Sequence, residues 1–329
     1  MILGIDTSCD DTGVGIVRDG VVLANVVSSQ TDLHAKYGGV VPEQASREHL
    51  SVIDHVVSEA LTRGGVTLDD IDVVAATYGP GLVGALLVGL TYAKALAWSR
   101  GLTFVGIHHL EGHIASCLAT GELEPPFLSL IASGGHTSLF EVEAPGRYLE
   151  LGKTRDDAAG EAFDKVARLL GLGFPGGPPL SNLAKRGNEQ AYPFKLPLRG
   201  QAGYDFSFSG LKTAVAVLLQ KEPQASKADV AASFERTVTE SLIEVALRAA
   251  NATGHQDLVV AGGVAANSRL RRRFSQVGLR VHFPPFELTT DNGAMIALAA
   301  ERRLPAASDW EIDAEPYLPL AESEPSSTT

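Results

Sequence analysis

Residues 2–17 have the sequence ILGIDTSCDDTGVGIV, in which two apolar runs flank a short polar stretch. The runs Ile2–Ile5 and Val14–Val17 have the composition of strands, and residues 7–13 between them have the small polar residues of a turn. This order predicts a β-hairpin at the start of the chain. Its tip carries hydroxyl, carboxylate and glycine residues.

The same order of elements recurs further along the chain. Leu128–Ala132 is apolar, residues 133–137 have the sequence SGGHT, and Ser138–Val142 forms a second run. A repeated hairpin predicts two lobes of related structure. Small residues at a hairpin tip leave backbone N–H groups open to an anion, so both tips suit phosphate binding.

A third apolar strand is followed by a glycine turn. Leu258–Ala261 precedes GGVAAN at residues 262–267, and a helix is expected to follow through Arg273. A buried strand that leads into a glycine turn and a helix is a common nucleotide-binding arrangement in α/β proteins. The strands alternate with expected helices, which predicts an α/β fold. These helices are expected at residues 48–62, 84–98 and 227–250.

The composition is that of a globular protein with a full core. The 329 residues exceed the roughly 150 typical of one domain, and 45% of them are hydrophobic. Cys9 and Cys117 are too few for a disulfide framework, which favours a reducing compartment. A strand is expected from the first residues, and the apolar run Leu82–Leu90 is shorter than the ~20 residues of a membrane span. We therefore expect a cytoplasmic protein that does not enter a membrane.

The formal net charge of −12 argues against a stand-alone nucleic-acid binder, because phosphate contacts come from lysine and arginine. It does not exclude a nucleic-acid substrate that is held by a local basic patch or by a partner. The densest basic cluster comprises Arg269, Arg271, Arg272 and Arg273. A solvated helix face and a nucleic-acid contact both remain open for this cluster.

Two histidines one helical turn apart suggest a metal site. His109 and His113 are i and i+4 on an expected helix, so both imidazoles face the same side and could share one ion. Spacing alone leaves a purely structural role open. Glu111 lies between them on a different face, unlike the glutamate of the zincin motif. Cys117 would lie ~12 Å from His109 along the helix and is expected in the core.

A metal held by two histidines needs a further ligand, and an oxygen donor is the natural complement for iron or zinc. The best candidate is Asp291, in the sequence TTDNGA at residues 289–294. The same residues could serve as the N-cap of the apolar helix that follows. The sequence leaves both interpretations of Asp291 open.

Acidic residues occur at two further places. Asp10 and Asp11 at the first hairpin tip could act as a general base or order water, or could be plain turn residues. One expected helix has an acidic start, formed by Asp156, Asp157, Glu161 and Asp164. A carboxylate there could bind a ribose hydroxyl, or the helix start could simply be solvated. The glycines and prolines of residues 173–179 predict a rigid loop.

Taken together, these segments resemble the tRNA N6-adenosine threonylcarbamoyltransferase family, formerly described as an O-sialoglycoprotein endopeptidase. The matching stretches run in family order from residue 5 to about residue 300. They are IDTSCDDT at 5–12, YGGVVPE at 37–43 with ASR at 45–47, GPGLVG at 79–84, HHLEGH at 108–113, SGGHT at 133–137, residues 156–165, PGGP at 175–178, DFSFSGLKT at 205–213 and GGVAAN at 262–267.

The resemblance implies the two-lobed actin/Hsp70/sugar-kinase (ASKHA) fold, with duplicated RNase H-like cores. We expect an N-terminal lobe over residues 1–107, to which a helix at about 292–315 returns. The lobe over residues 108–291 is expected to carry the metal and nucleotide sites, and residues 320–329 are expected to form a disordered tail.

The resemblance also implies an activity, the transfer of a threonylcarbamoyl group from threonylcarbamoyl-AMP to N6 of adenosine 37 in tRNAs that read codons beginning with A. The implied cofactor is one divalent metal, Fe²⁺ with Zn²⁺ as the alternative, and its ligands fall on His109, His113 and Asp291. The implied partners are a paralogous pseudo-enzyme subunit (TsaB) and a small ATPase (TsaE), as in bacterial relatives. The implied adenylate contacts are Ile131, Ala132, Ser133, Gly134, Gly135, Asp164, Gly177 and Asn267.

One departure concerns the candidate catalytic carboxylates. The family usually has Asp-Glu where this chain has Asp10 and Asp11. The second side chain is one methylene shorter, which puts a role of Asp11 as base in question.

Three rival functions follow from the same residues. A metallopeptidase would need a general-base glutamate beside the histidines, and Glu111 faces elsewhere. A sugar kinase or ATPase would share the fold, but two helical histidines are unusual for it. A non-catalytic scaffold would need neither a metal trio nor three glycine turns.

Overall fold

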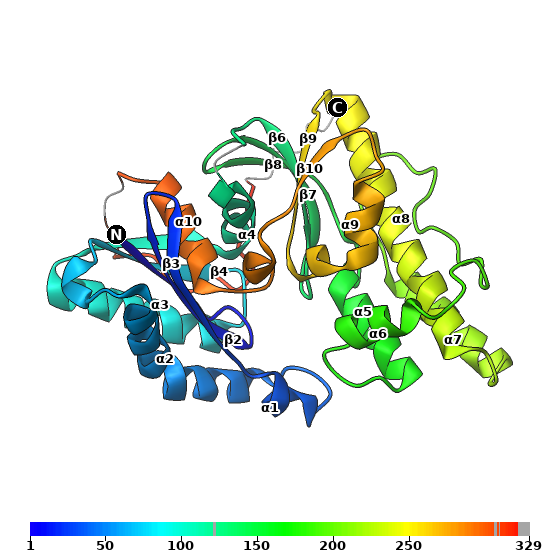
Figure 1. Cartoon of the computed structure of the whole chain (residues 1–329), viewed down its shortest axis with the longest axis horizontal. Coiled ribbons are helices and arrows are strands. Elements are labelled where there is room, and N and C mark those ends of the chain that lie inside the picture. Colours follow the sequence, from blue (N-terminus) through cyan, green and yellow to red (C-terminus); the bar gives the residue numbers. More distant parts are fainter. Residues whose placement is uncertain (121–122, 306–307, 309, 322–329) are drawn as a thin grey trace. The chain divides into compact units, whose positions relative to one another are not determined.

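The computed structural model contains two five-stranded sheets with their helices (Figure 1). It describes residues 1–120, 123–305, 308 and 310–321. The chain forms two compact units. The first comprises Met1–Pro125, Ala144–Arg147 and Pro284–Thr329, and the second comprises Pro126–Glu143 and Tyr148–Phe283.

The sheet of the first unit has the order β3-β2-β1-β4-β5. Its first three strands pair antiparallel, whereas β4 adds to β1 and β5 adds to β4 in parallel. The expected hairpin is the pair β1–β2, with Ile5 opposite Val14. The strands are β1 (Ile2–Asp6), β2 (Asp11–Arg18), β3 (Val21–Ser29), β4 (Val73–Gly79) and β5 (Thr103–His108).

The sheet of the second unit repeats this topology, with the order β10-β9-β6-β7-β8. Strands β6 and β7 form the second expected hairpin, and β9 adds to β6 in parallel, as β4 adds to β1. The internal repeat predicted from the sequence is therefore confirmed. The strands are β6 (Phe127–Ala132), β7 (Thr137–Ala144), β8 (Arg147–Lys153), β9 (Asp257–Ala261) and β10 (Arg280–His282).

Helices cover both faces of the first sheet. The two helices expected at 48–62 and 84–98 are α2 and α3, and α2 begins earlier, with Pro42 in its first turn, where proline costs no hydrogen bond. The helical segments of this unit are α1 (Thr31–Ala35), α2 (Pro42–Gly64), η1 (Leu68–Asp70), α3 (Val83–Arg100), α4 (His109–Cys117), η2 (Leu118–Thr120), η4 (Phe286–Leu288) and α10 (Gly293–Arg302).

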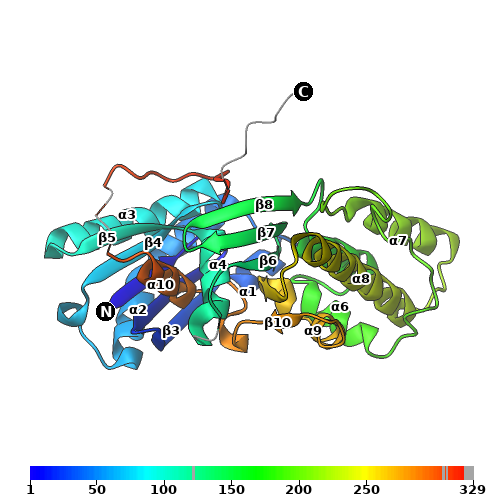
Figure 2. The ribbon, with the colours of Figure 1, turned by 90° about the horizontal axis from the view of Figure 1, so that it is seen from above.

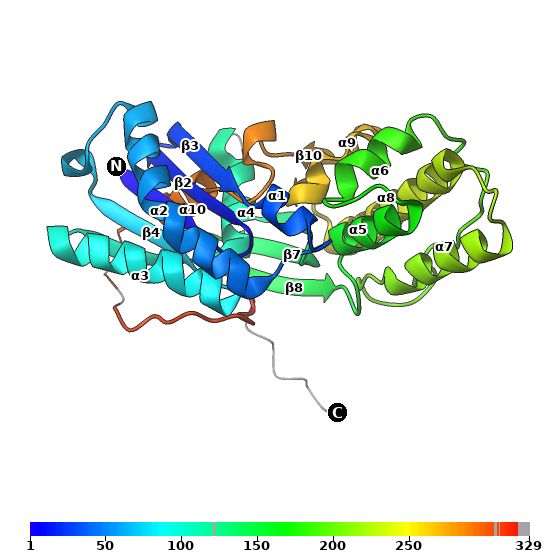
Figure 3. The ribbon, with the colours of Figure 1, turned by 90° about the horizontal axis from the view of Figure 1, so that it is seen from below.

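The alternation of side chains along β1 explains the two layers. Leu3 and Ile5 pack in the core under α2 and α3, and Ile2 packs in the core formed with α10. Figure 3 shows α2 and α3 across one face of the sheet, and Figure 2 shows α10 from the opposite side. A Cβ atom at Gly15 would meet the backbone of Ala294, so glycine lets α10 approach the sheet closely.

Helix α10 is shorter than the helix expected at 292–315, because it ends at Arg302. Pro305 follows within three residues, and a proline can neither continue a helix nor follow a helical residue easily. The tail expected at 320–329 lies outside the described residues from 322 onward.

The second unit packs its helices around one large core. Leu128 and Leu130 of β6 contact the same cluster as Phe163 of α5 and Phe234 of α8. The helix expected at 227–250 is α8, extended to Thr253. The helical segments are α5 (Ala159–Leu170), α6 (Gly177–Ala184), α7 (Ser209–Lys221), α8 (Lys227–Thr253), η3 (Gly263–Ala266) and α9 (Ser268–Phe274).

The prediction of a rigid loop at residues 173–179 is wrong for the C-terminal end of that segment. Gly177, Pro178 and Pro179 form the first turn of α6 rather than a loop. The first N–H groups of a helix have no partner within it, so two prolines are tolerated there.

The boundary between the units differs from the expected one. Residues 108–125 and those from Pro284 onward belong to the first unit, so the histidine pair and Asp291 do as well. The reason is that α4 packs closely on α10. A Cβ at Gly112 would lie 2.9 Å from Ile296 Cδ1, and α10 in turn packs on the first sheet. None of the helices over the described ranges is long and apolar enough to cross a membrane.

Candidate functional site

The two histidines enter the site from the start of α4. Strand β5 ends at His108, whose side chain accepts a hydrogen bond from the N–H of Leu110 at 3.1 Å and so caps the helix. One helical turn then brings His109 and His113 to the same side, with ring centroids 4.8 Å apart. Both side chains are buried.

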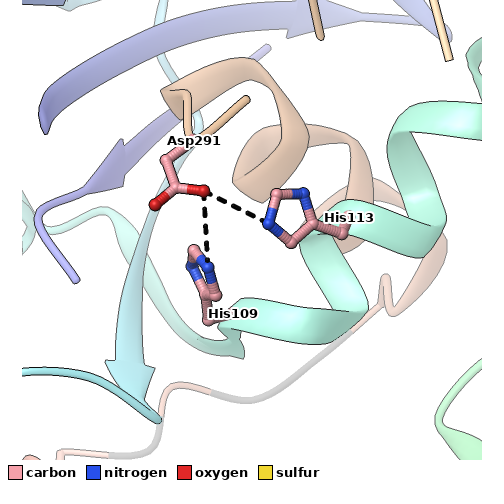
Figure 4. A group of neighbouring side chains, drawn as sticks. All are labelled: His109, His113 and Asp291. Atoms are coloured by element: carbon pink, nitrogen blue, oxygen red, sulfur yellow. Dashed lines mark ion pairs between the residues drawn. The ribbon is translucent and has the colours of Figure 1, made fainter. Parts of the chain in front are cut away.

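Asp291 reaches the same point from the residues that precede α10. Its Oδ1 atom lies 3.2 Å from Nε2 of His113 and 3.6 Å from Nε2 of His109 (Figure 4). One ligand atom from each of the three residues falls within 4.8 Å of the others. The N-cap of α10 is the neighbouring Asn292, which accepts from the N–H of Met295, so Asp291 does not serve as the cap.

The donor set fits a metal ion. His113 is fully buried; over the described residues neither ring nitrogen forms a hydrogen bond, and Nε2 has only the ion-pair contact with Asp291. Leaving such a group unsatisfied costs about 1–3 kcal/mol, which a bound cation would offset. Two imidazoles and one carboxylate are the ligands of iron and zinc sites that keep open positions.

The second nitrogen of His109 is held in place from the first hairpin. Its Nδ1 lies 3.1 Å from Ser8 Oγ and 3.4 Å from Asp6 Oδ1. Burial alone would lower the pKa of His109, but the carboxylates of Asp291 and Asp6 raise it to about 9. A carboxylate behind a histidine is a common way to orient a metal ligand. Sequence reasoning missed this role of Asp6, because nothing in the spacing pairs residue 6 with residue 109.

Asp10 and Asp11 lie at the hairpin tip in the same unit. Burial raises the pKa of Asp11 to about 7, with a further increase from the charge of Asp291, while a hydrogen bond from Ser29 opposes it. Ser8, in the same turn, lies 3.1 Å from Nδ1 of His109, so this hairpin end is close to the metal trio. The backbone carbonyl of Asp10 accepts from the N–H of Gln30 at 3.1 Å, which fixes the turn.

His49 of α2 forms hydrogen bonds with the same tip. Its Nδ1 lies 2.7 Å from Thr12 Oγ1 and its Nε2 lies 3.0 Å from the carbonyl of Cys9. Burial lowers its pKa, which favours the neutral imidazole. Sequence reasoning missed this contact, since it joins a helix to a hairpin over a long separation.

Glu111 does not face the metal trio. It is buried on α4 and forms a two-atom ion pair with Arg303 at the end of α10, with Oε1 3.0 Å from the guanidinium Nε. This removes the acid that a peptidase mechanism would require. Cys117 is buried in the core, as expected.

The candidate nucleotide residues all lie in the second unit. Ile131 and Ala132 end strand β6, and Ser133, Gly134 and Gly135 form the hairpin tip that follows. A Cβ atom at either glycine would meet nothing within 4 Å, so the backbone at this tip is open. The hairpin and its exposed glycine tip are as expected, and the role of this tip in nucleotide binding stays a prediction.

Asp164 is hydrogen-bonded to Gly176, the residue before Gly177. Oδ1 of Asp164 accepts from the N–H of Gly176 at 2.7 Å, which fixes the start of α6. Gly177 is the first residue of that helix and also faces open space. Helix starts with free N–H groups attract anions.

Both the oxygen and the nitrogen of the Asn267 side-chain amide form hydrogen bonds. Its Oδ1 accepts from the N–H of Leu270 at 2.9 Å and caps α9. Its Nδ2 donates to Ser181 Oγ at 2.9 Å and to Glu235 Oε1 at 2.7 Å. Neither Ser181 nor Glu235 was predicted from the sequence.

The acidic start of α5 has structural partners. Asp156 accepts hydrogen bonds from both hydroxyls and two backbone N–H groups of residues 207–209; although burial raises its pKa, these bonds hold the pKa below its usual value. Asp157 pairs with Lys165 at 2.7 Å. Asp156 is exposed and Asp157 half-buried, so this segment is solvated as well as hydrogen-bonded, and a ribose contact there stays a prediction.

The arginine cluster is mostly engaged within the second unit. Arg269 is buried and pairs with Glu189 and Glu240, and Arg273 pairs with Glu240 at 2.7 Å. Arg271 donates to the carbonyl of Ala265 at 2.7 Å. A uniformly solvated helix face is excluded, because Arg269 is buried and all three side chains have partners within the unit.

Comparison with known proteins decides the family. The family model described as "TsaD: tRNA N6-adenosine threonylcarbamoyltransferase" matches residues 21–298. A Thermus thermophilus protein of that name is 58% identical over 325 residues, covering 98% of this chain and 99% of the relative. The chain belongs to the tRNA N6-adenosine threonylcarbamoyltransferase family. A relative of the same name from Microcystis aeruginosa is 54% identical and covers 98% of both chains.

More distant solved structures share the fold of this transferase. The crystal structure of T. kodakarensis HypF has a TM-score of 0.64 at 14% identity, covering 92% of this chain and 46% of that one. Component A of the Acidaminococcus fermentans (R)-2-hydroxyglutaryl-CoA dehydratase has a TM-score of 0.57 at 19% identity, covering 92% and 98%. With the duplicated sheet order, these likenesses confirm the expected actin/Hsp70/sugar-kinase fold class.

Proposed function

We propose that the chain transfers a threonylcarbamoyl group from threonylcarbamoyl-AMP to N6 of adenosine 37 in tRNAs that read codons beginning with A, forming N6-threonylcarbamoyladenosine. The observation that carries this proposal is the match to the transferase family over nearly the whole chain. The convergence of His109, His113 and Asp291 supports it, because the three residues are distant in sequence and meet in one place.

The reaction requires help because N6 of adenine is a weak nucleophile, its lone pair being delocalised into the ring. N6 attacks the carbamoyl carbon, a C–N bond forms, the C–O bond to the phosphate breaks, and AMP leaves with the electron pair. One proton of the amine must go to a base. The protein has to orient the donor, stabilise the leaving phosphate and accept this proton.

His109, His113 and Asp291 would hold one divalent metal, Fe²⁺ with Zn²⁺ as the alternative. When bound, such an ion supplies Lewis-acid stabilisation of negative charge on the donor. Asp6 and Ser8 fix the His109 ring by its Nδ1 atom and leave Nε2 facing Asp291. The ring is therefore preorganised for a ligand before any ion binds.

Asp10 and Asp11 are the proposed bases. A group that takes a proton at neutral pH works best with a pKa near 7, and the pKa of Asp11 is raised to about that value in the metal-free protein. The side chain of Asp11 is one methylene shorter than the family's usual glutamate. The simplest arrangement is therefore a water molecule that relays the proton from the amine to Asp11.

The second unit is proposed to hold the adenylate part of the donor. Ser133, Gly134 and Gly135 offer an open hairpin tip for the phosphate, and Gly177 offers a bare helix start. The rest of this site would be formed by Ile131, Ala132, Asp164 and Asn267.

The net charge of −12 indicates that the tRNA is not held by this chain's overall charge. We propose that a paralogous pseudo-enzyme subunit (TsaB) and a small ATPase (TsaE) assist, and that the enzyme acts in the cytoplasm, where its tRNA substrate is found.

Reconstitution tests the proposal. The purified chain, with and without the partner subunits, is incubated with threonylcarbamoyl-AMP, unmodified tRNA and either Fe²⁺ or Zn²⁺, and the nucleosides are analysed by mass spectrometry. The expected product is N6-threonylcarbamoyladenosine together with one AMP per transfer. No modified adenosine under any of these conditions, or cleavage of a peptide library by the same sample, would contradict it.

A further inference from the structure

Two arginines at the C-terminal end of α10 bind to α4, the helix that packs beside it (Figure 2). Arg303 forms an ion pair with Glu111 in the middle of α4, with its Nε atom 3.0 Å from Oε1 and its Nη2 atom against Oε2. Arg302 donates to the carbonyl of Leu118, the C-cap of α4, at 3.3 Å. These contacts hold α4 at two points along its length.

Glu111 lies on the opposite side of α4 from the two candidate ligands. It follows His109 by two residues and precedes His113 by two, which places it about 200° around the helix from each of them. Its side chain is buried, and the guanidinium of Arg303 meets both of its oxygens. The ion pair therefore holds the back of a helix whose front carries two histidines.

The other side chains of α4 do little to fix its orientation. All nine residues of the helix are buried. Apart from Glu111 and the two histidines, they are apolar or small, and Ser116 donates to the helix's own backbone. Apolar contacts are non-directional, and a core loses its unique arrangement before it loses stability. Apolar packing alone would therefore allow α4 to turn or slide slightly against α10.

His113 depends on the placement of α4 more than His109 does. The Nδ1 atom of His109 is held by Ser8 and Asp6 of the first hairpin. Over the described residues neither ring nitrogen of His113 forms a hydrogen bond, so the position of this ring follows the helix itself. A small rotation of α4 would move Nε2 of His113 away from Asp291 Oδ1, which lies 3.2 Å from it.

Helix α10 connects this anchor to the third candidate ligand. It begins at Gly293, two residues after Asp291, and Arg303 is its C-cap. Near the same end, Glu301 accepts from the N–H of Gly20, in the turn between β2 and β3, at 2.9 Å. One helix, fixed to the first sheet, thus follows directly on Asp291 at its start and holds the back of α4 at its end.

A buried ion pair suits the task of defining one arrangement better than that of adding stability. Removing two charges from water offsets much of their attraction, so an apolar pair of similar volume often gives equal or greater stability. The attraction and the two parallel hydrogen bonds are directional, however, and are lost when the helices shift.

We propose that the ion pair between Glu111 and Arg303 is a positioning device for the metal site. It fixes the rotation and register of α4 against α10, so that His113 and His109 face Asp291, and Arg302 assists at the C-cap of α4. Neither Glu111 nor Arg303 touches the ion. This inference rests on the proposed function, since it assigns the residues that align the proposed ligands.

The test separates positioning from stability by replacing both charges with apolar groups. The double variant Glu111→Leu with Arg303→Met should melt at or above the temperature of the wild type. Its affinity for Zn²⁺, titrated calorimetrically into the metal-free full chain, should fall about 10-fold. The visible absorption spectrum of bound Co²⁺, which reports the geometry of the ligands, should change as well.

Two single variants complete the test. Arg303→Lys keeps the charge but loses the two-atom contact, so its affinity for Zn²⁺ should fall about 3-fold, and it decides the question if the double variant does not fold. The matched control is Ile53→Val on α2, a core residue under the opposite face of the first sheet. It should lower the melting temperature and leave the Zn²⁺ affinity and the Co²⁺ spectrum unchanged.

The outcomes distinguish this inference from the metal site itself. If the wild type binds Zn²⁺ and the double variant and Arg303→Lys bind it equally well with an unchanged Co²⁺ spectrum, the positioning role is overturned and the metal site stands. If the wild type binds neither ion, the metal site fails, and the positioning role fails with it.

Discussion

Asp6 Oδ1 lies 3.4 Å from Nδ1 of His109, so a carboxylate from the first strand faces a candidate metal ligand from α4. This contact joins two residues that are 103 positions apart in the chain. A carboxylate behind a histidine keeps the ring in one orientation and strengthens its other nitrogen as a ligand.

Replacing Asp6 with asparagine should therefore weaken metal binding. We expect Asp6→Asn to lower the affinity for Zn²⁺ about 10-fold, because a neutral amide holds the imidazole N–H less strongly. Calorimetric titration of the metal-free protein measures this. The control is Asp54→Asn in the same unit, which removes a carboxylate charge but keeps an oxygen that can accept from Tyr92. Equal affinity of Asp6→Asn and wild type would show that Asp6 does not tune the site.

Metal binding should depend on pH through His109. Its pKa is raised to about 9 in the metal-free protein, so the ring is protonated at neutral pH and must lose a proton to bind a metal. The affinity should rise with pH up to about 9, and about one proton should be released per ion at pH 7. Titrations in buffers of different ionisation enthalpy count the protons, and zero release at pH 7 would contradict the prediction.

The same pKa makes a prediction for the stability of the metal-free protein. A histidine whose folded pKa is raised stabilises the fold fully below its unfolded value of 6.5. That contribution is lost as the pH rises through about 9. Denaturant unfolding of wild type and His109→Gln between pH 6 and 10 should show the difference shrinking with pH; a constant difference would argue against a charged His109.

The sequence predicted the repeat more fully than the site. Alternating apolar runs around small polar turns revealed both hairpins, because a strand pattern is local. The contacts of Asp6, His49 and Glu235 join distant elements, and no local pattern encodes them. Asp291 is an intermediate case: its sequence context allowed a cap or a ligand, and only the position of Asn292 assigns the cap.

Close packing of α10 on the first sheet makes Gly15 sensitive to substitution. A Cβ atom there would meet the backbone of Ala294, near the start of α10 and three residues after Asp291. Gly15→Ala should cost about 2 kcal/mol or more in the free energy of unfolding and weaken metal binding, since α10 must shift. Gly210→Ala is the control, because its Cβ enters open space within α7 and should stabilise by about 0.5–1 kcal/mol. Equal effects of the two changes would contradict this account of the packing.

Arg269 should contribute to stability rather than to tRNA binding. It is buried between Glu189 and Glu240, so Arg269→Met leaves Glu189 without its partner and Glu240 with Arg273 alone, and should cost about 2–4 kcal/mol. Arg272→Met on the same helix is the control and should change stability by less than about 0.5 kcal/mol. Thermal unfolding measures both. A fully stable Arg269→Met with reduced tRNA affinity would restore the nucleic-acid interpretation of the cluster.

The central claim is that threonylcarbamoyl transfer depends on the ion held by His109, His113 and Asp291. The most direct test measures metal content and single-turnover transfer to tRNA in the same sample of Asp291→Ala, beside the adjacent control Thr290→Ala. The account predicts that Asp291→Ala loses the metal and roughly 100-fold or more of the transfer rate, while Thr290→Ala keeps both. Wild-type transfer by metal-free Asp291→Ala would contradict it.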